Sequence, residues 1–77
     1  MSGTRLSLWG IEIFVATAEE GSISEAARRL ETSAATVSQQ VTNLEGALGA
    51  TLLVRDERPV KLTPAGALFL PLSLIHI

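Results

Sequence analysis

The sequence predicts a mainly α fold in which a three-helix core is followed by a small β-hairpin. Three observations carry this prediction. Apolar residues recur at helical spacing from residue 7 to residue 48, turn signals divide that stretch into three segments, and short β-prone runs replace the helical period after Ala50. We expect a single domain, because 77 residues are too few for two.

The first helix is expected from about Ser7 to Glu20. Its apolar stripe contains Leu8, Ile11, Phe14, Val15 and Ala18. Gly21 follows, in the position of a left-handed residue that ends a helix. A stripe of this kind normally covers neighbouring helices, so we assign this segment to the scaffold, with Trp9 at the edge of the core or against another subunit.

Two further helices joined by a short turn are predicted next, with the helix-turn-helix spanning about residues 23–42. Ser22 or Ser24 can cap the first helix, and Ser33 can cap the second after a turn at Glu31 and Thr32. The apolar sides hold Ile23, Ala26, Ala27 and Leu30 in the first helix, and Val37, Val41, Leu44 and Leu48 in the second. Gly49 is placed to end the second helix.

The second helix of this pair has an unusual polar side. From Ala34 to Asn43 it carries no charge, and its polar residues are hydroxyls and amides. Such groups both donate and accept hydrogen bonds, which suits the edges of bases in the major groove of DNA. This pattern favours double-stranded DNA as the partner of this helix.

A β-hairpin is expected after Gly49. Thr51 to Val54 and Val60 to Leu62 are short β-prone runs, and Asp56 to Pro59 is turn-like. A two-stranded hairpin is unstable alone, so it must lie against the helices with its charged tip, Arg55 to Arg58, projecting. A helix-turn-helix followed by a hairpin is a winged helix-turn-helix. Arg55 and Arg58 are then candidates for phosphate or minor-groove contacts, the alternative being solvated turn charges.

A fourth helix is predicted to start at Thr63 and Pro64, which provide a cap and a proline at the first helical position. We expect this linker helix to cover only residues 64–70, because Pro71 interrupts it. Residues 71–77 have no helical period and no charge, and form an atypical tail. The predicted DNA-binding domain therefore covers residues 6–63.

Composition limits the function classes. The net charge of −2 and a pI near 5.2 count against nucleic-acid binding, although Arg55, Arg58 and Lys61 cluster late in the chain and could make one face positive. The absence of cysteine excludes disulfides, thiolate metal sites and cysteine nucleophiles. His76, the only histidine, has no acidic neighbour in sequence, so we predict no catalytic residue, no metal site, no cofactor and no enzyme activity. No signal peptide or membrane-spanning run is visible, so we expect a cytoplasmic protein.

The order and spacing of several motifs resemble the amino-terminal DNA-binding domain of LysR-type transcriptional regulators, from about Leu6 to Leu70. The matching motifs are Phe14-Val15-Ala16, Gly21-Ser22-Ile23, Ala26-Ala27, Leu30, Thr32-Ser33, Val37-Ser38-Gln39-Gln40-Val41, Leu44-Glu45, Leu48-Gly49 and Leu62-Thr63-Pro64-Ala65-Gly66. The resemblance implies a sequence-specific, DNA-binding regulator of transcription. It implies DNA contacts by Ser33, Ala34, Ala35, Thr36, Ser38, Gln39, Gln40 and Asn43 of the recognition helix, and by Arg55 and Arg58 of the wing.

The chain departs from the family pattern in two ways. Ala34 stands where the family often has Gln, and Ala35 where Pro or Ser is frequent, which leaves apolar contact with a thymine methyl as what alanine can offer. Full-length members also continue into a longer dimerising linker helix and a ligand-binding domain. The resemblance thus implies a dimer or tetramer only for the full-length protein, and a small-molecule inducer only through that missing domain. A winged-helix module for protein contacts is the alternative function, favoured by the acidic balance and the Leu-rich tail.

Overall fold

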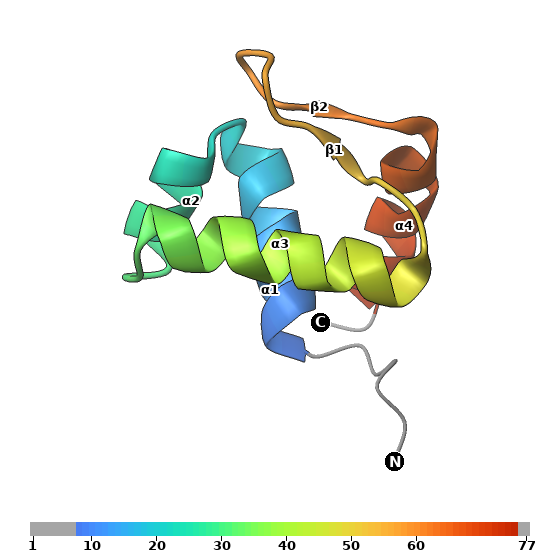
Figure 1. The fold of residues 1–77 in the computed structure, drawn as a ribbon, viewed down its shortest axis with the longest axis horizontal. Coiled ribbons are helices and arrows are strands. Elements are labelled where there is room, and N and C mark those ends of the chain that lie inside the picture. The colour runs from blue at the N-terminus through green and yellow to red at the C-terminus, as the bar shows by residue number, and fades with distance from the viewer. Residues whose placement is uncertain (1–7, 76–77) are drawn as a thin grey trace.

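The computed structural model describes residues 8–75 of the chain, with side chains for residues 8–70. The described part contains the helices α1 (Leu8–Glu20), α2 (Ile23–Arg29), α3 (Ala34–Leu48) and α4 (Pro64–Ile75), and the strands β1 (Leu53–Val54) and β2 (Lys61–Leu62). In Figure 1, α3 runs across the molecule in front of α1, with α2 near one end of α3 and α4 near the other. The predicted winged helix-turn-helix is confirmed.

The core is centred on α1, which contacts α2, α3 and α4. Its buried apolar residues come from the first three helices and the hairpin segment: Ile13, Phe14, Val15, Ala16, Ala26, Ala27, Val37, Val41, Leu44, Leu52, Leu53 and Val60. α4 adds the partly buried Ala65, Phe69 and Leu70. The predicted stripe of α1 is right for Phe14 and Val15, but Leu8 is exposed whereas Ile13 and Thr17 are fully buried. Helices on several sides of α1 bury most of its circumference, so a single stripe does not describe it. The buried Thr17 hydroxyl donates to the Ile13 carbonyl at 2.8 Å, which satisfies it inside the core.

Both predicted helix caps of the helix-turn-helix are confirmed. The Ser22 hydroxyl accepts a hydrogen bond from the Glu25 amide at 3.2 Å, and the Ser33 hydroxyl accepts one from the Thr36 amide at 3.0 Å. Gly49 ends α3 in the left-handed conformation, with φ +71°. These local signals fix where α2 and α3 begin and where α3 ends. The predicted start of the first helix at Ser7 lies outside the described residues.

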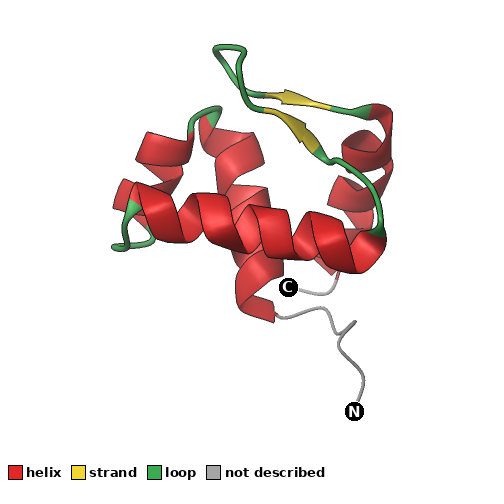
Figure 2. Ribbon diagram, in the orientation of Figure 1, coloured by secondary structure: helices red, strands yellow, loops and turns green. Residues whose placement is uncertain are grey.

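The hairpin is closed at its base and is attached to the turn between α1 and α2. β1 and β2 are antiparallel, with Leu53 opposite Leu62, and each strand is shorter than the predicted run. The Val60 amide donates to the Gly21 carbonyl at 2.8 Å, and the Thr63 amide donates to the Leu52 carbonyl at 2.9 Å. Figure 2 shows the remaining loop of the hairpin extending beyond the helices. The wing therefore has a fixed base and a projecting tip.

The end of α4 differs from the prediction. We expected it to stop at Leu70, but the helix continues through Pro71 to Ile75. Proline fixes φ near −65°, which is a helical value, so Pro71 removes one backbone hydrogen bond without forcing the chain out of the helix. The expectation that the whole segment 71–77 lacks helical structure is therefore wrong for 71–75, and residues 76–77 lie outside the description.

α4 lies very close to the start of the hairpin. A Cβ atom at Gly66 would come within 2.1 Å of the Leu52 carbonyl oxygen, so only glycine fits there. The rings of Phe14 and Phe69 pack with centroids 5.5 Å apart, which joins α4 to α1. α4 is thus part of the packed domain from its first turn.

Candidate nucleic-acid interface

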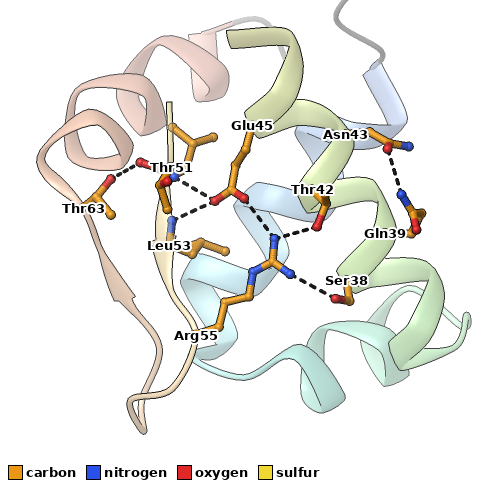
Figure 3. A network of polar contacts seen from close by, with 10 residues as sticks. Ser38, Gln39, Thr42, Asn43, Glu45, Thr51, Leu53, Arg55 and Thr63 are labelled. Atoms are coloured by element: carbon orange, nitrogen blue, oxygen red, sulfur yellow. Dashed lines mark hydrogen bonds and ion pairs between the residues drawn. The ribbon is translucent and has the colours of Figure 1, made fainter. Parts of the chain in front are cut away.

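Two rows of residues on α3, most of them polar, point in different directions. Ala35, Gln39 and Asn43 follow one another at intervals of four and are all exposed; we call them the outer row. Ser38, Thr42 and Glu45 form a second line at spacings of four and three on the side facing the hairpin; we call them the wing-side row. Figure 3 shows Gln39 and Asn43 of the outer row beside the wing-side row on α3.

The outer row makes few contacts within the protein. The Gln39 side-chain amide donates to the Asn43 side-chain oxygen at 2.9 Å, along the exposed surface of the helix. A bond of this kind between two solvated side chains contributes little to stability, so both amides can exchange it for bonds to a ligand. The row is uncharged and faces away from the core.

Gln40 lies apart from the outer row. It follows the buried Val37 by three residues and precedes the buried Leu44 by four, and it is itself only partly exposed. Gln39 and Gln40 were both expected to contact DNA, although this spacing already separates them. Gln39 is the glutamine that the fold presents outward.

The start of α3 is shaped by its cap. The Ser33 hydroxyl accepts from the Thr36 amide and donates to the Thr36 hydroxyl at 2.9 Å, so both side chains have a structural role. Ala34 and Ala35 are exposed, and the small side chains leave the amides of the first turn accessible. One end of the candidate interface is therefore formed by Ser33, Ala34, Ala35 and Thr36.

Arg55 lies against α3, where it contacts the wing-side row (Figure 3). Its Nη1 donates to the Ser38 hydroxyl at 3.0 Å, and its Nη2 donates to the Thr42 hydroxyl at 3.1 Å and to the Glu45 carboxylate at 3.0 Å. The Arg55 side chain is 29% exposed. The expectation that Arg55 projects with the hairpin tip is wrong, because its partners on α3 hold its side chain against that helix.

Glu45 connects the same contacts to the backbone of the hairpin. Its Oε1 accepts from Arg55, while its Oε2 accepts from the amides of Leu52 and Leu53 at 2.8 and 3.3 Å. One carboxylate thus pairs with the arginine and also satisfies the start of β1. Sequence reasoning did not select Thr42 or Glu45, although their spacing from Ser38 places all three on one side of a helix.

The basic residues differ in whether their charge is already paired. Arg28 lies 3.5 Å from Glu25, and Arg29 contacts Glu19 at 2.8 Å and Glu20 at 3.2 Å. The hydrogen bond that Arg29 donates to Glu19, followed by the one it donates to Glu20, raises the pKa of Arg29 above its usual range. Within residues 8–70, Arg58 and Lys61 are the basic side chains without a carboxylate partner, and both belong to the wing. Arg58 is exposed and donates to the Arg55 carbonyl at 3.0 Å.

An apolar groove lies between the end of α3 and α4, away from the outer row. Its volume is about 250 Å³, and it is lined by Leu48, Ala50, Leu52, Ala65, Leu68 and Phe69. The Leu68 side chain is 76% exposed, which is high for a large apolar residue. Among the described residues, no helix is long and apolar enough to span a bilayer, and no cluster of three potential metal ligands occurs.

Sequence comparison places this arrangement in a known family. The sequence profile of the family described as bacterial regulatory helix-turn-helix protein, lysR family, matches residues 8–67. The chain belongs to the LysR family. The match covers α1, the helix-turn-helix, the wing and the start of α4.

Curated relatives in this family are transcriptional regulators. The chain is 52% identical over 60 residues to the HTH-type transcriptional regulator TfdS of Cupriavidus pinatubonensis (strain JMP 134 / LMG 1197), which covers 78% of this chain and 20% of TfdS. It is 47% identical over 69 residues to ClcR of Pseudomonas putida, which covers 87% of this chain and 24% of ClcR. The chain thus spans about a fifth to a quarter of the length of these LysR relatives.

Solved structures of LysR-family domains have the same fold. The complex of the BenM DNA-binding domain with catB site 1 DNA superposes with a TM-score of 0.86 at 40% identity, over 90% of this chain and 74% of that one. The CbnR domain in complex with DNA gives a TM-score of 0.86 at 36% identity, over 90% of this chain and 79% of that one. Both similar domains were solved bound to DNA.

Proposed function

We propose that this chain is the DNA-reading domain of a LysR-type transcriptional regulator. In this proposal α3 enters the major groove of double-stranded DNA, and the wing lies on the flanking backbone. Ala35, Ser38, Gln39 and Asn43 contact base edges, with Thr42 added to the set expected from the sequence. Gln40 contributes less than Gln39, because it lies beside the buried side of α3.

The observation that carries the proposal is the separation of neutral and charged groups on the surface. The outer row presents exposed amides without charge, which suits base edges. The basic side chains without carboxylate partners, Arg58 and Lys61, lie on the neighbouring wing, where they suit phosphates. The helix start at Ala34 and Ala35 supplies amide groups for a further phosphate.

The proposal extends to assembly. With few unpaired cations, one domain is expected to bind weakly, so two domains on adjacent half-sites would supply the affinity. The exposed Leu68 and the apolar groove beside α4 support a homo-oligomer of the full-length protein formed through that helix. Any small-molecule inducer would act through a further domain. We propose a binding role in the cytoplasm, without catalysis.

A module for protein contacts is the second candidate. The net charge of −2, the ion pairs of Arg28 and Arg29, and the apolar groove favour it. It differs from DNA reading in its surface, because it would use the groove and leave the outer row free. The two candidates can therefore be separated by which surface responds to substitution.

Fluorescence-anisotropy titration tests the proposal. The purified chain is titrated against the intergenic duplex beside its own gene and against a scrambled duplex, at several salt concentrations. Preferential, salt-sensitive binding to the intergenic duplex is the expected result. A chain that binds neither duplex, even when a dimerising coiled coil is fused after Ile77, would contradict the proposal and favour protein contacts.

A further inference from the structure

The contacts of Arg55 bear on how α3 would read DNA. Its guanidinium donates to the hydroxyls of Ser38 and Thr42 at 3.0 and 3.1 Å. A hydroxyl has one proton to donate and two lone pairs that accept, whereas a guanidinium only donates. Each of these hydroxyl oxygens therefore accepts from Arg55, and its own proton is directed elsewhere.

We propose that Arg55 is a positioning residue that determines whether the hydroxyls of Ser38 and Thr42 donate or accept hydrogen bonds. This inference rests on the proposed function. Arg55 uses one lone pair of each hydroxyl oxygen and places a positive charge beside it, which disfavours a second donor there, so both hydroxyls meet the DNA preferentially as donors. Their partners are acceptor atoms, either N7 or O6 of guanine and O4 of thymine, or a phosphate oxygen. Without Arg55, the same hydroxyls could also accept from the amino groups of adenine or cytosine, and the choice of base would relax.

Glu45 keeps Arg55 available for this task. The Glu45 carboxylate lies 3.0 Å from Arg55 Nη2, and its other oxygen is held by the amides of Leu52 and Leu53. The Glu45 side chain is 16% exposed, so water screens this pair less than a surface pair. The carboxylate offsets the charge of Arg55, which favours its place on α3 over a DNA phosphate. Arg58 has no such partner and serves as the matched wing arginine.

The test is a binding selection at low salt from duplexes with a randomised centre, using the purified chain and its variants. Ser38→Ala first shows what the hydroxyl contacts. If it contacts a base, we expect the preference for guanine or thymine at one position to fall by about fivefold; if it contacts phosphate, affinity should fall about fivefold for all sequences.

Where the Ser38 hydroxyl contacts a base, Arg55→Met should relax the preference at that position as Ser38→Ala does, and the double variant should lose little more there, because both substitutions remove one oriented interaction. A second position, contacted by Thr42, should relax in Arg55→Met alone. Where the Ser38 hydroxyl contacts phosphate, Arg55→Met should weaken all sequences by a smaller factor than Ser38→Ala, because the hydroxyl is still present but no longer oriented. The base pair contacted by Gln39 should keep its sequence preference in Arg55→Met. Arg58→Met is the control. It should weaken binding to all sequences alike and reduce the slope of log affinity against log salt concentration by the amount expected for about one phosphate contact.

Arg55→Lys serves if Arg55→Met fails to fold, as judged by circular dichroism. Lysine keeps the charge beside Glu45, but its one nitrogen cannot span the partners of both Nη1 and Nη2. We expect Arg55→Lys to lose the contribution to binding that depends on the Ser38 hydroxyl and to keep the contribution that depends on the Thr42 hydroxyl.

Two results would overturn the inference. If the losses from Arg55→Met and Ser38→Ala multiply, and Arg55→Met lowers the salt slope as Arg58→Met does, then Arg55 holds a phosphate directly. An Arg55→Lys variant that keeps all of the binding contribution removed by Ser38→Ala would also contradict the inference. If wild type binds no duplex even with the coiled coil fused after Ile77, the proposed function fails and the inference with it, an outcome distinct from either of these.

Discussion

The outer row and the wing-side row lie on the same helix but use their polar groups differently. Gln39 and Asn43 bond to each other on an exposed surface, whereas Ser38, Thr42 and Glu45 are joined to Arg55 and to the start of β1. The first row can change partners at little cost to the fold. The second row orients the hairpin relative to α3. The difference shows that exposed polarity on one helix can serve two purposes, recognition and alignment.

Among the substitutions considered, Gly66→Ala should have the largest effect on stability, because it disturbs the contact between α4 and the hairpin. Gly66→Ala places a Cβ within 2.1 Å of the Leu52 carbonyl, so the backbone of α4 or the hairpin must move. We expect a loss of about 3 kcal/mol in the free energy of unfolding, at the upper end of ordinary overpacking. Urea denaturation measures it.

Gly46→Ala is the matched control for this prediction. Gly46 lies within α3, and a Cβ there would meet nothing within 4 Å. Alanine should therefore raise the free energy of unfolding by about 0.5–1 kcal/mol through helix propensity. Equal effects of the two substitutions would show that α4 does not depend on its close approach to Leu52.

Glu45→Ala tests the wing-side row. It leaves Arg55 without its carboxylate and the amides of Leu52 and Leu53 without their acceptor. We expect a loss of about 2 kcal/mol by urea denaturation, since partly buried donors remain unsatisfied. Glu45→Gln keeps one side-chain oxygen as an acceptor and should cost less; a loss as large as that of alanine would mean that the charge alone matters.

Gln39→Ala and Gln40→Ala sharpen the comparison on the DNA side. Gln39 is exposed on the outer row, so its removal should reduce discrimination between a selected duplex and a scrambled one by about 1–2 kcal/mol without changing stability. Gln40→Ala should have the smaller effect on discrimination, as measured by anisotropy. The reverse order would show that α3 meets DNA with a different side than we propose.

Arg58→Ala should have the smallest effect, about 0.5–1 kcal/mol of affinity for selected and scrambled duplexes alike. Arg58 is an exposed wing cation without a carboxylate partner, so it supplies charge rather than base choice. Titrations at several salt concentrations measure the change in slope. A loss confined to the selected duplex would assign Arg58 a role in base recognition instead.

Local signals allowed most of the fold to be predicted. Ser33 and Gly49 act within one helical turn, so sequence alone places the two ends of α3 correctly. Pro71 was misjudged because a proline can remain inside a helix at the loss of one hydrogen bond. The buried side of α1 was predicted only in part, because α2, α3 and α4 all pack on it.

The candidate site was less predictable than the fold. Arg55 finds its partners 10 to 17 residues earlier in the chain, and no local pattern shows that the hairpin folds back onto α3. The position of its side chain against α3 therefore required the tertiary structure. The distinction between Gln39 and Gln40 was available from their spacing relative to Val37 and Leu44.

The absence of charge between Ala34 and Asn43 has a consequence for how operator preference could diverge. Exchanging one neutral side chain for another at residue 35, 39 or 43 leaves the electrostatic potential of the domain, and hence its general attraction to nucleic acid, almost unchanged. Duplicated genes could therefore acquire different operators through single substitutions while the strength of nonspecific binding stays constant. The same property makes these three positions suitable for a combinatorial library.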